Sequence, residues 1–143
     1  MKPKVLFVCV ENACRSQMAE GFARLYGSGM IHAYSAGSRP APRVNPDAVH
    51  VMSEIKVDIG KQSPKAIVDV LGHNVDYIVS MGCGDACPRL PGTIHIEWKI
   101  PDPKGKDLDF FRDVRDLIAM RVRELIIDIT PPTTQRRRHA ETF

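Results

Sequence analysis

The sequence has few cysteines, no long hydrophobic run and almost no excess of charge of either sign. Four cysteines in 143 residues are too few for the disulfide framework of a small secreted protein, so we expect free thiols in a reducing compartment. The first apolar run, from Val5 to Val10, has six residues, and no stretch approaches the roughly 20 that a transmembrane helix needs. We therefore expect a cytoplasmic protein with no membrane partner.

The small net charge argues against nucleic acid as a partner. The formal charge is +3, and Arg136, Arg137 and Arg138 near the C-terminus supply three positive charges. Without residues 131–143, 17 basic and 16 acidic side chains remain, so the rest of the chain is nearly neutral. The length suits one domain with its own core, which we expect over residues 1–130, followed by a disordered basic tail over residues 131–143.

Strand-like and helix-like segments alternate along the chain. Apolar runs rich in Val and Ile predict four strands, at residues 4–10, 31–35, 75–81 and 94–98. Apolar residues at helical spacing predict helices from Ser16, from Pro46 with Ile55 on its apolar face, from Pro64 after an N-cap at Ser63, and over residues 108–129. This alternation predicts a doubly wound, flavodoxin-like α/β fold with a four-stranded parallel sheet and helices on both faces.

The expected position of a binding site follows from this fold. Doubly wound sheets bind ligands beyond the carboxyl ends of their strands. In this chain those ends lead into the turn after Val10 and into loops over residues 82–92 and 99–107. Three of the four cysteines lie in these loops, and the fourth, Cys9, ends the first strand.

The segment from Cys9 to Ser16 is typical of a loop that binds an oxyanion. Five residues separate Cys9 from Arg15, enough to surround one tetrahedral anion with backbone N–H groups that point inward. Arg15 can hold two oxygens with its planar guanidinium, and the same field favours a thiolate at Cys9, to which Ser16 can donate a hydrogen bond. In the alternative interpretation Cys9 is a buried strand residue and Arg15 a surface charge. The residues expected to bind the oxyanion are Val10, Glu11, Asn12, Ala13, Cys14 and Arg15.

The motifs together resemble one known family. They are the C-x5-R-S loop, Gln17-Met18-Ala19-Glu20, Tyr34-Ser35-Ala36-Gly37, Met81-Gly82-Cys83 and Asp102-Pro103. Over residues 3–129 the chain resembles an arsenate reductase of the low-molecular-weight protein tyrosine phosphatase superfamily. The resemblance implies that Cys9 is the nucleophile, that Arg15 binds the oxyanion, and that Ser16 stabilises the thiolate. It also implies that Asp102 is the general acid.

Cys83 and Cys87 are the second group of candidate catalytic residues. They lie four positions apart on one loop, close enough to form a disulfide after a modest rearrangement. A phosphatase does not need this pair, whereas arsenate must take up two electrons to leave as arsenite. With the resemblance, this implies a relay from Cys9 through Cys83 to Cys87, recycled by thioredoxin or a similar thiol reductant. The alternatives are two buried structural cysteines, or half of a zinc site with Cys9 and Cys14.

Four positions depart from the family pattern. Lys104 follows the Asp-Pro pair where tyrosine phosphatases of the superfamily carry an aromatic residue, which weighs against a phosphotyrosine substrate. Glu11 adds a carboxylate to the anion loop, and we expect its side chain to face solvent. Cys14 is either inert or able to form a protective disulfide with Cys9. Lys65 stands where some members have an acidic residue of a potassium site, so we expect its ammonium to take the place of the cation.

These observations give one leading hypothesis and two alternatives. The leading one is a cytoplasmic, monomeric arsenate reductase that binds arsenate, or phosphate or sulfate as its mimic, and that uses no cofactor or metal. The first alternative is a low-molecular-weight phosphatase that hydrolyses phosphotyrosine or small phosphoesters through a cysteinyl-phosphate intermediate. The second, from a different class, is a thiol-sensing or metal-sensing binding protein.

Overall fold

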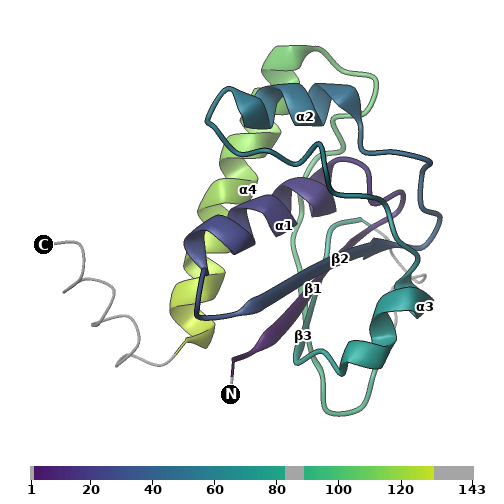
Figure 1. The fold of residues 1–143 in the computed structure, drawn as a ribbon, viewed down its shortest axis with the longest axis vertical. Coiled ribbons are helices and arrows are strands. Elements are labelled where there is room, and N and C mark those ends of the chain that lie inside the picture. The colour runs from purple at the N-terminus through teal and green to yellow at the C-terminus, as the bar shows by residue number, and fades with distance from the viewer. Residues whose placement is uncertain (1, 83–88, 131–143) are drawn as a thin grey trace, which may run out of the picture.

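Four parallel strands form the central sheet of the structure, which is a computed structural model that describes residues 2–82 and 89–130 (Figure 1). The strands are β1 (Lys4–Cys9), β2 (His32–Gly37), β3 (Tyr77–Ser80) and β4 (Ile94–Glu97), in the order β2-β1-β3-β4. The chain passes from β1 to β2 on one side of it, and then to β3 and β4 on the other side. The carboxyl ends of β1 and β3 therefore flank the switch point at which such sheets bind ligands.

Helices cover both faces of this sheet, as predicted. On one face lie α1 (Arg15–Tyr26), α2 (Pro46–Ser53) and α4 (Leu108–Ile129), whose apolar side chains pack in one core with Val5, Phe7 and Cys9 of β1. On the other face α3 (Ile67–Val70), which continues into the short 3-10 helix η1 (Leu71–His73), packs against Leu6 and Val8. The continuous apolar run of β1 follows from this burial on both faces.

The long C-terminal helix has the bounds that its apolar spacing predicts. Its buried side chains recur every three or four residues, which places them on one stripe against the sheet; they are Phe111, Val114, Ile118, Val122, Leu125 and Ile126. The carboxylate of Asp107 caps the helix by accepting a hydrogen bond from the backbone N–H of Phe110 at 2.9 Å. The cap and the continuous stripe both lie within one segment, so this helix could be predicted from local sequence.

Two details of the sequence-based helices are wrong. The helix predicted from Pro64 begins only at Ile67, because the backbone before it bonds to other segments. The N–H of Lys65 donates to Oδ1 of Asn12 at 2.9 Å, and the carbonyl of Lys65 accepts from the N–H of Gly37 at 2.8 Å. Ile55, predicted on the buried face of α2, lies beyond the end of that helix and is 40% exposed.

Some expectations fall outside the part of the chain that the structure describes. Cys83 and Cys87 lie between the two described ranges, and the predicted basic tail, residues 131–143, lies after the second. Their predicted roles therefore stay predictions. No helix within the described ranges is long and apolar enough to cross a membrane.

Candidate active site

A pocket of about 330 Å³ lies at the carboxyl end of β1. Cys9 and Arg15 line it from the loop after β1, and Asp102 and Lys104 line it from the loop after β4. These two loops are nearly 90 residues apart in sequence, and the fold brings them to the same edge of the sheet, as the parallel topology predicts. The other lining residues are Val10, Glu11, Ala13, Cys14, Ala41, Pro42, Arg43, Asn45 and Pro46.

The backbone of the loop over residues 10–14 has its carbonyl groups turned outward. The segment after β2 donates three backbone hydrogen bonds to it, from Arg39 to Val10 at 2.8 Å, from Ala41 to Glu11 at 2.9 Å and from Asn45 to Ala13 at 2.9 Å. The carbonyl of Asn12 accepts from the side chain of Gln17 at 2.9 Å. A trans peptide points each following N–H the opposite way. The N–H groups of residues 11–14 therefore face the inside of the loop.

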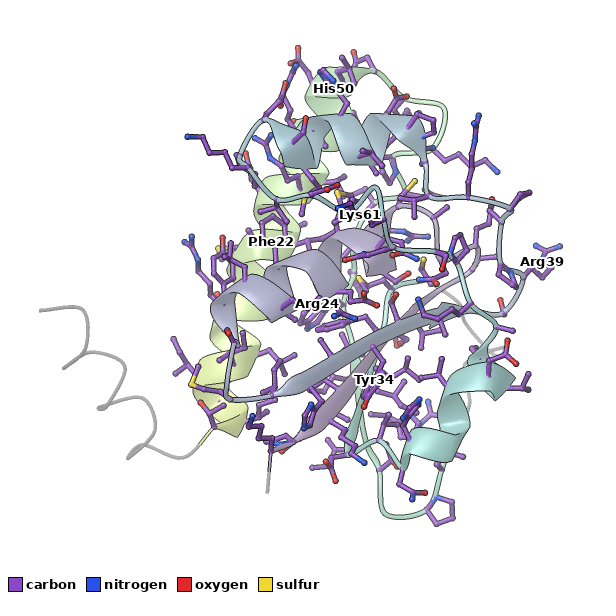
Figure 2. The ribbon with its side chains drawn as sticks, in the orientation of Figure 1. Phe22, Arg24, Tyr34, Arg39, His50 and Lys61 are labelled. Atoms are coloured by element: carbon purple, nitrogen blue, oxygen red, sulfur yellow. The ribbon has the colours of Figure 1, made fainter. Side chains whose placement is uncertain are left out.

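Gly37, the last residue of β2, lets these segments approach one another. A Cβ at this position would lie 2.6 Å from the carbonyl oxygen of Val10 and 2.8 Å from the backbone nitrogen of Asn12. Backbone atoms cannot give way as a side-chain tip can, so only glycine fits. Arg39, two residues later, bonds to the loop through its backbone while its side chain projects into solvent (Figure 2).

Cys9, Ser16 and Asn12 form a buried hydrogen-bonded series. The Sγ of Cys9 lies 2.9 Å from Oγ of Ser16, and that oxygen accepts a hydrogen bond from Nδ2 of Asn12 at 2.7 Å. The orientation of the Asn12 amide is fixed, because its Oδ1 accepts from the backbone N–H of Lys65 at 2.9 Å. The hydroxyl of Ser16 therefore remains free to donate its own hydrogen to the sulfur.

The guanidinium of Arg15 lies between the two loops. Its Nη1 donates to the carbonyl of Ile100 at 3.0 Å, and its Nη2 lies 3.7 Å from Oδ2 of Asp102. Gly82, with φ of +91°, packs directly against this group, since a Cβ there would meet Nη1 at 2.7 Å. The last described residue before Cys83 is therefore in contact with the arginine of the pocket.

Asp102 and Lys104 share a tight turn at the edge of the pocket. The side chain of Asp102 is 54% exposed, and its Oδ1 accepts a hydrogen bond from the N–H of Lys104 at 3.1 Å. The intervening Pro103 is buried and fixes one backbone angle of the turn. Asp102 thus combines access to solvent with a defined position beside Arg15.

Cys14 is a second thiol of the loop, and it is buried. Burial first, and then the charges of Asp102 and Cys9, raise its pKa from the ordinary value of 9.0 to about 12. A thiol with such a pKa stays protonated at neutral pH. The thiolate, which is the reactive form, is therefore disfavoured at Cys14.

Glu11, which we expect to face solvent, is partly exposed, since 35% of its side chain remains accessible. Its carboxylate accepts a hydrogen bond from the ammonium of Lys104 at 2.5 Å, so that the two loops are joined by an ion pair. The sequence contained a signal for this contact: Glu11 and Lys104 are both departures from the family pattern, and they have opposite charge. The pairing could not be predicted, because the two residues are far apart in the sequence.

The ammonium of Lys65 lies beside a buried carboxylate, as predicted. Glu20 is 2% exposed, and its Oε1 accepts from Oγ of Ser35 at 2.7 Å and lies 3.9 Å from Nζ of Lys65. Arg24 donates to its other oxygen at 3.1 Å. Glu20 therefore has two cationic partners. Within residues 2–82 and 89–130, no group of three or more His, Cys, Asp or Glu side chains could hold a metal ion.

Comparison with known proteins places this geometry in a family. The chain matches the family described as low molecular weight phosphotyrosine protein phosphatase over residues 4–136. It is 40% identical to the glutaredoxin arsenate reductase of Synechocystis over 130 residues, which cover 89% of this chain and 98% of that protein. The chain therefore belongs to the low-molecular-weight phosphotyrosine protein phosphatase family.

Solved structures show the same relationship. An arsenate reductase in its phosphate-binding state superposes with a TM-score of 0.80 at 40% identity, covering 91% of this chain and all of that one. A thioredoxin-dependent arsenate reductase of Corynebacterium glutamicum superposes with a TM-score of 0.78 at 37% identity, covering 90% of this chain and 62% of that one. The predicted fold and family are both confirmed.

Proposed function

We propose that this protein reduces arsenate to arsenite at the pocket of Cys9. The observation that carries the proposal is the Cys9–Ser16 contact of 2.9 Å in a pocket that Arg15 and Asp102 also line. This is the arrangement for a thiolate nucleophile, an oxyanion and an acid. The similarity to proteins named arsenate reductase, at 36–40% identity over at least 85% of the chain, supports arsenate as the substrate.

In the first step the loop binds arsenate and Cys9 attacks it. The inward N–H groups of residues 11–14 and the guanidinium of Arg15 bind the oxygens. The Cys9 thiolate forms an S–As bond, and one hydroxyl of hydrogen arsenate leaves as water as it takes a proton from Asp102. Arsenic stays in its pentavalent state through this step.

In the second step two electrons pass from sulfur to arsenic. The thiolate of Cys83 attacks Sγ of Cys9, a disulfide forms between them, and the S–As bond breaks with its electron pair on arsenic. Trivalent arsenite leaves. The thiolate of Cys87 then attacks Cys83, which forms the Cys83–Cys87 disulfide and restores the Cys9 thiolate. The contact of Gly82 with Arg15 supports this order, since Cys83 is the next residue.

A dithiol protein of the thioredoxin class then reduces the Cys83–Cys87 disulfide and returns the enzyme to its starting state. The thioredoxin-dependent relative supports this choice of reductant. In our proposal the cycle runs in the reducing cytoplasm, and one chain supplies every catalytic group except the external dithiol.

Hydrolysis of phosphate esters by the same nucleophile is the competing activity. Lys104 lines the pocket in place of an aromatic side chain, so a phenyl ring has no ring to stack against at this position. The pair Cys83 and Cys87 supplies electrons, which ester hydrolysis does not use. Both features support reduction as the function.

The experiment compares the two activities in one preparation. Reduced protein is supplied with thioredoxin, its reductase and NADPH, and arsenite formation from arsenate is measured beside phosphate release from p-nitrophenyl phosphate. We expect arsenite formation to require Cys9, Cys83 and Cys87. Ester hydrolysis that survives the Cys83→Ser substitution and far exceeds arsenate reduction would instead assign a phosphatase.

A further inference from the structure

An ion pair joins Glu11 of the anion loop to Lys104, the residue that follows the Asp102-Pro103 pair. Its two atoms, Oε1 and Nζ, are 2.5 Å apart, and both residues line the pocket. The pair is part of the pocket mouth, because 35% of the Glu11 side chain and 59% of the Lys104 side chain remain exposed. Each charge is therefore at the boundary between the site and solvent.

Lys104 cannot move independently of Asp102. Its backbone N–H donates to Oδ1 of Asp102 at 3.1 Å, and Pro103 between them is rigid and buried. The carbonyl of Pro103 accepts from the N–H of Lys106 at 2.9 Å, which closes the turn. A contact that holds the Lys104 side chain therefore also limits where the Asp102 carboxylate can lie.

The pair also changes the electrostatics of the anion loop. An unpaired carboxylate at Glu11 would repel an incoming oxyanion, and the ammonium of Lys104 offsets that charge. The hydrogen bond and charge of Glu11 raise the pKa of Lys104 above its ordinary value, so the ammonium stays protonated at neutral pH. The ammonium is thus available to offset the Glu11 carboxylate.

The direction from which Cys9 attacks determines which leaving groups come close to the Glu11–Lys104 pair. A group that leaves in line departs on the side opposite the Cys9 sulfur, where an acid must protonate it. In our proposed function that acid is Asp102, beside Lys104. When the leaving group is a bare oxygen, it needs no further room. When it is an aryl alcohol, its ring must extend past Asp102 into the space beside the Glu11–Lys104 pair.

We propose that the Glu11–Lys104 ion pair is a specificity-determining latch that admits a free tetrahedral oxyanion and excludes phosphate esters with an aromatic leaving group. It does so in two ways: it occupies the mouth beside Asp102, and it holds that turn against the anion loop. This inference rests on the proposed function for the identity of the acid. It adds two positioning residues that act through the shape of the mouth.

The test is a pair of binding measurements that need no turnover. Inorganic phosphate represents the free oxyanion, and benzylphosphonate represents an aryl ester that cannot be hydrolysed. Calorimetry on reduced protein gives both dissociation constants for the wild type, Glu11→Gln and Lys104→Ala. The ratio of the two constants isolates selectivity, because a loss of charge alone weakens both anions. Lys106→Ala, two positions along the same loop, is the matched control.

We expect the wild type to prefer phosphate, and each latch variant to shift the ratio at least about tenfold toward benzylphosphonate. The effects of Glu11→Gln and Lys104→Ala should not add in the double variant, because either change breaks the same contact. The swapped variant Glu11→Lys with Lys104→Glu should restore much of the preference. Lys106→Ala should keep the wild-type ratio.

A ratio that stays within about twofold of wild type in both single variants would overturn the latch, since a tenfold change is the size of effect the contact predicts. So would equal shifts in Lys104→Ala and in the Lys106→Ala control. The two proposals fail separately. If the wild type forms no arsenite but the ratio shifts as expected, the latch is retained and the proposed reduction is rejected.

Discussion

The Oγ of Ser16 lies 2.9 Å from the Sγ of Cys9 and accepts a hydrogen bond from Asn12, so its own hydrogen is free to bond to the sulfur. We therefore predict that Ser16→Ala weakens the nucleophile. A hydrogen bond to a charged group contributes about 1.5–3 kcal/mol, which corresponds to a loss of roughly 10-fold to 100-fold in kcat/KM.

A second measurement separates this effect from a general disturbance of the pocket. The rate at which iodoacetamide alkylates Cys9 reports the reactivity of its sulfur, so at neutral pH this rate should fall in Ser16→Ala. Ser16→Thr, which keeps a hydroxyl, should restore part of the wild-type rate. An unchanged rate in Ser16→Ala would show that the hydroxyl does not activate the sulfur.

Gly82 gives a prediction about the position of Arg15. A Cβ at Gly82 would meet Nη1 of Arg15 at 2.7 Å, so Gly82→Ala should displace the guanidinium and weaken phosphate binding at least about tenfold. Gly92→Ala is the matched control, because Gly92 also has a positive φ, +78°, but a Cβ added there would meet no atom within 4 Å. Both variants carry a backbone strain of about 1–2 kcal/mol. Equal loss of phosphate affinity in the two would contradict the steric explanation.

Cys14 should react far more slowly than Cys9 at neutral pH. Its pKa, raised to about 12 chiefly by burial, keeps it protonated until the solution is strongly alkaline. Iodoacetamide treatment of folded, reduced protein at pH 7, followed by mass spectrometry of the peptides, should find Cys9 modified first. The same treatment in denaturant should modify both thiols equally. Preferential modification of Cys14 in the folded protein would contradict its assignment as a protonated, buried thiol.

Glu54 provides the prediction for acid stability. Its carboxylate accepts hydrogen bonds from Arg112 and Arg115, which join the end of α2 to α4. The hydrogen bond and charge of Arg112, with those of Arg115, lower the pKa of Glu54 from 4.5 to about 2. A carboxyl group whose pKa is lower in the folded than in the unfolded state stabilises the fold at pH values above its unfolded-state pKa. This contribution is lost as the pH falls through the folded-state pKa.

Glu54→Gln should therefore lower the melting temperature at pH 7. The difference from wild type should shrink as the pH falls from about 4.5 toward 2, because wild-type Glu54 then becomes protonated. Glu124→Gln serves as the control, since Glu124 forms only an exposed pair with Arg121 at 3.6 Å. A difference that does not change with pH would show that Glu54 acts through its shape and not its charge.

Local patterns in the sequence were sufficient to predict much of the fold. The apolar run of β1 and the apolar stripe of α4 each depend on a single segment, and both were predicted closely. The start of α3 was not, because Lys65 bonds to Asn12 and Gly37, which are distant in sequence. Helical propensity near Pro64 cannot compete with these two hydrogen bonds of the Lys65 backbone, one to the side chain of Asn12 in the anion loop and one to Gly37 at the end of β2.

The candidate site, like the fold, was only partly predictable from local sequence. Cys9, Arg15 and Ser16 lie within one loop and one helical turn, so their spacing alone indicated an anion site. The resemblance to a family added Asp102. The Glu11–Lys104 pair was missed because a contact across 93 positions leaves no periodic signal in one sequence. What the sequence offered was two unusual charges of opposite sign, and only the fold shows that they meet.

The central claim is that electrons pass from sulfur to arsenic in a fixed order, and a single-turnover experiment tests it most directly. Reduced wild type and Cys87→Ser are each mixed with arsenate without external reductant, arsenite is counted per chain, and disulfides are mapped by mass spectrometry. The account predicts one arsenite per chain in both, with a Cys83–Cys87 disulfide in the wild type and a Cys9–Cys83 disulfide in the variant. Arsenite formation in the variant without a Cys9–Cys83 disulfide, or none in the wild type, would contradict it.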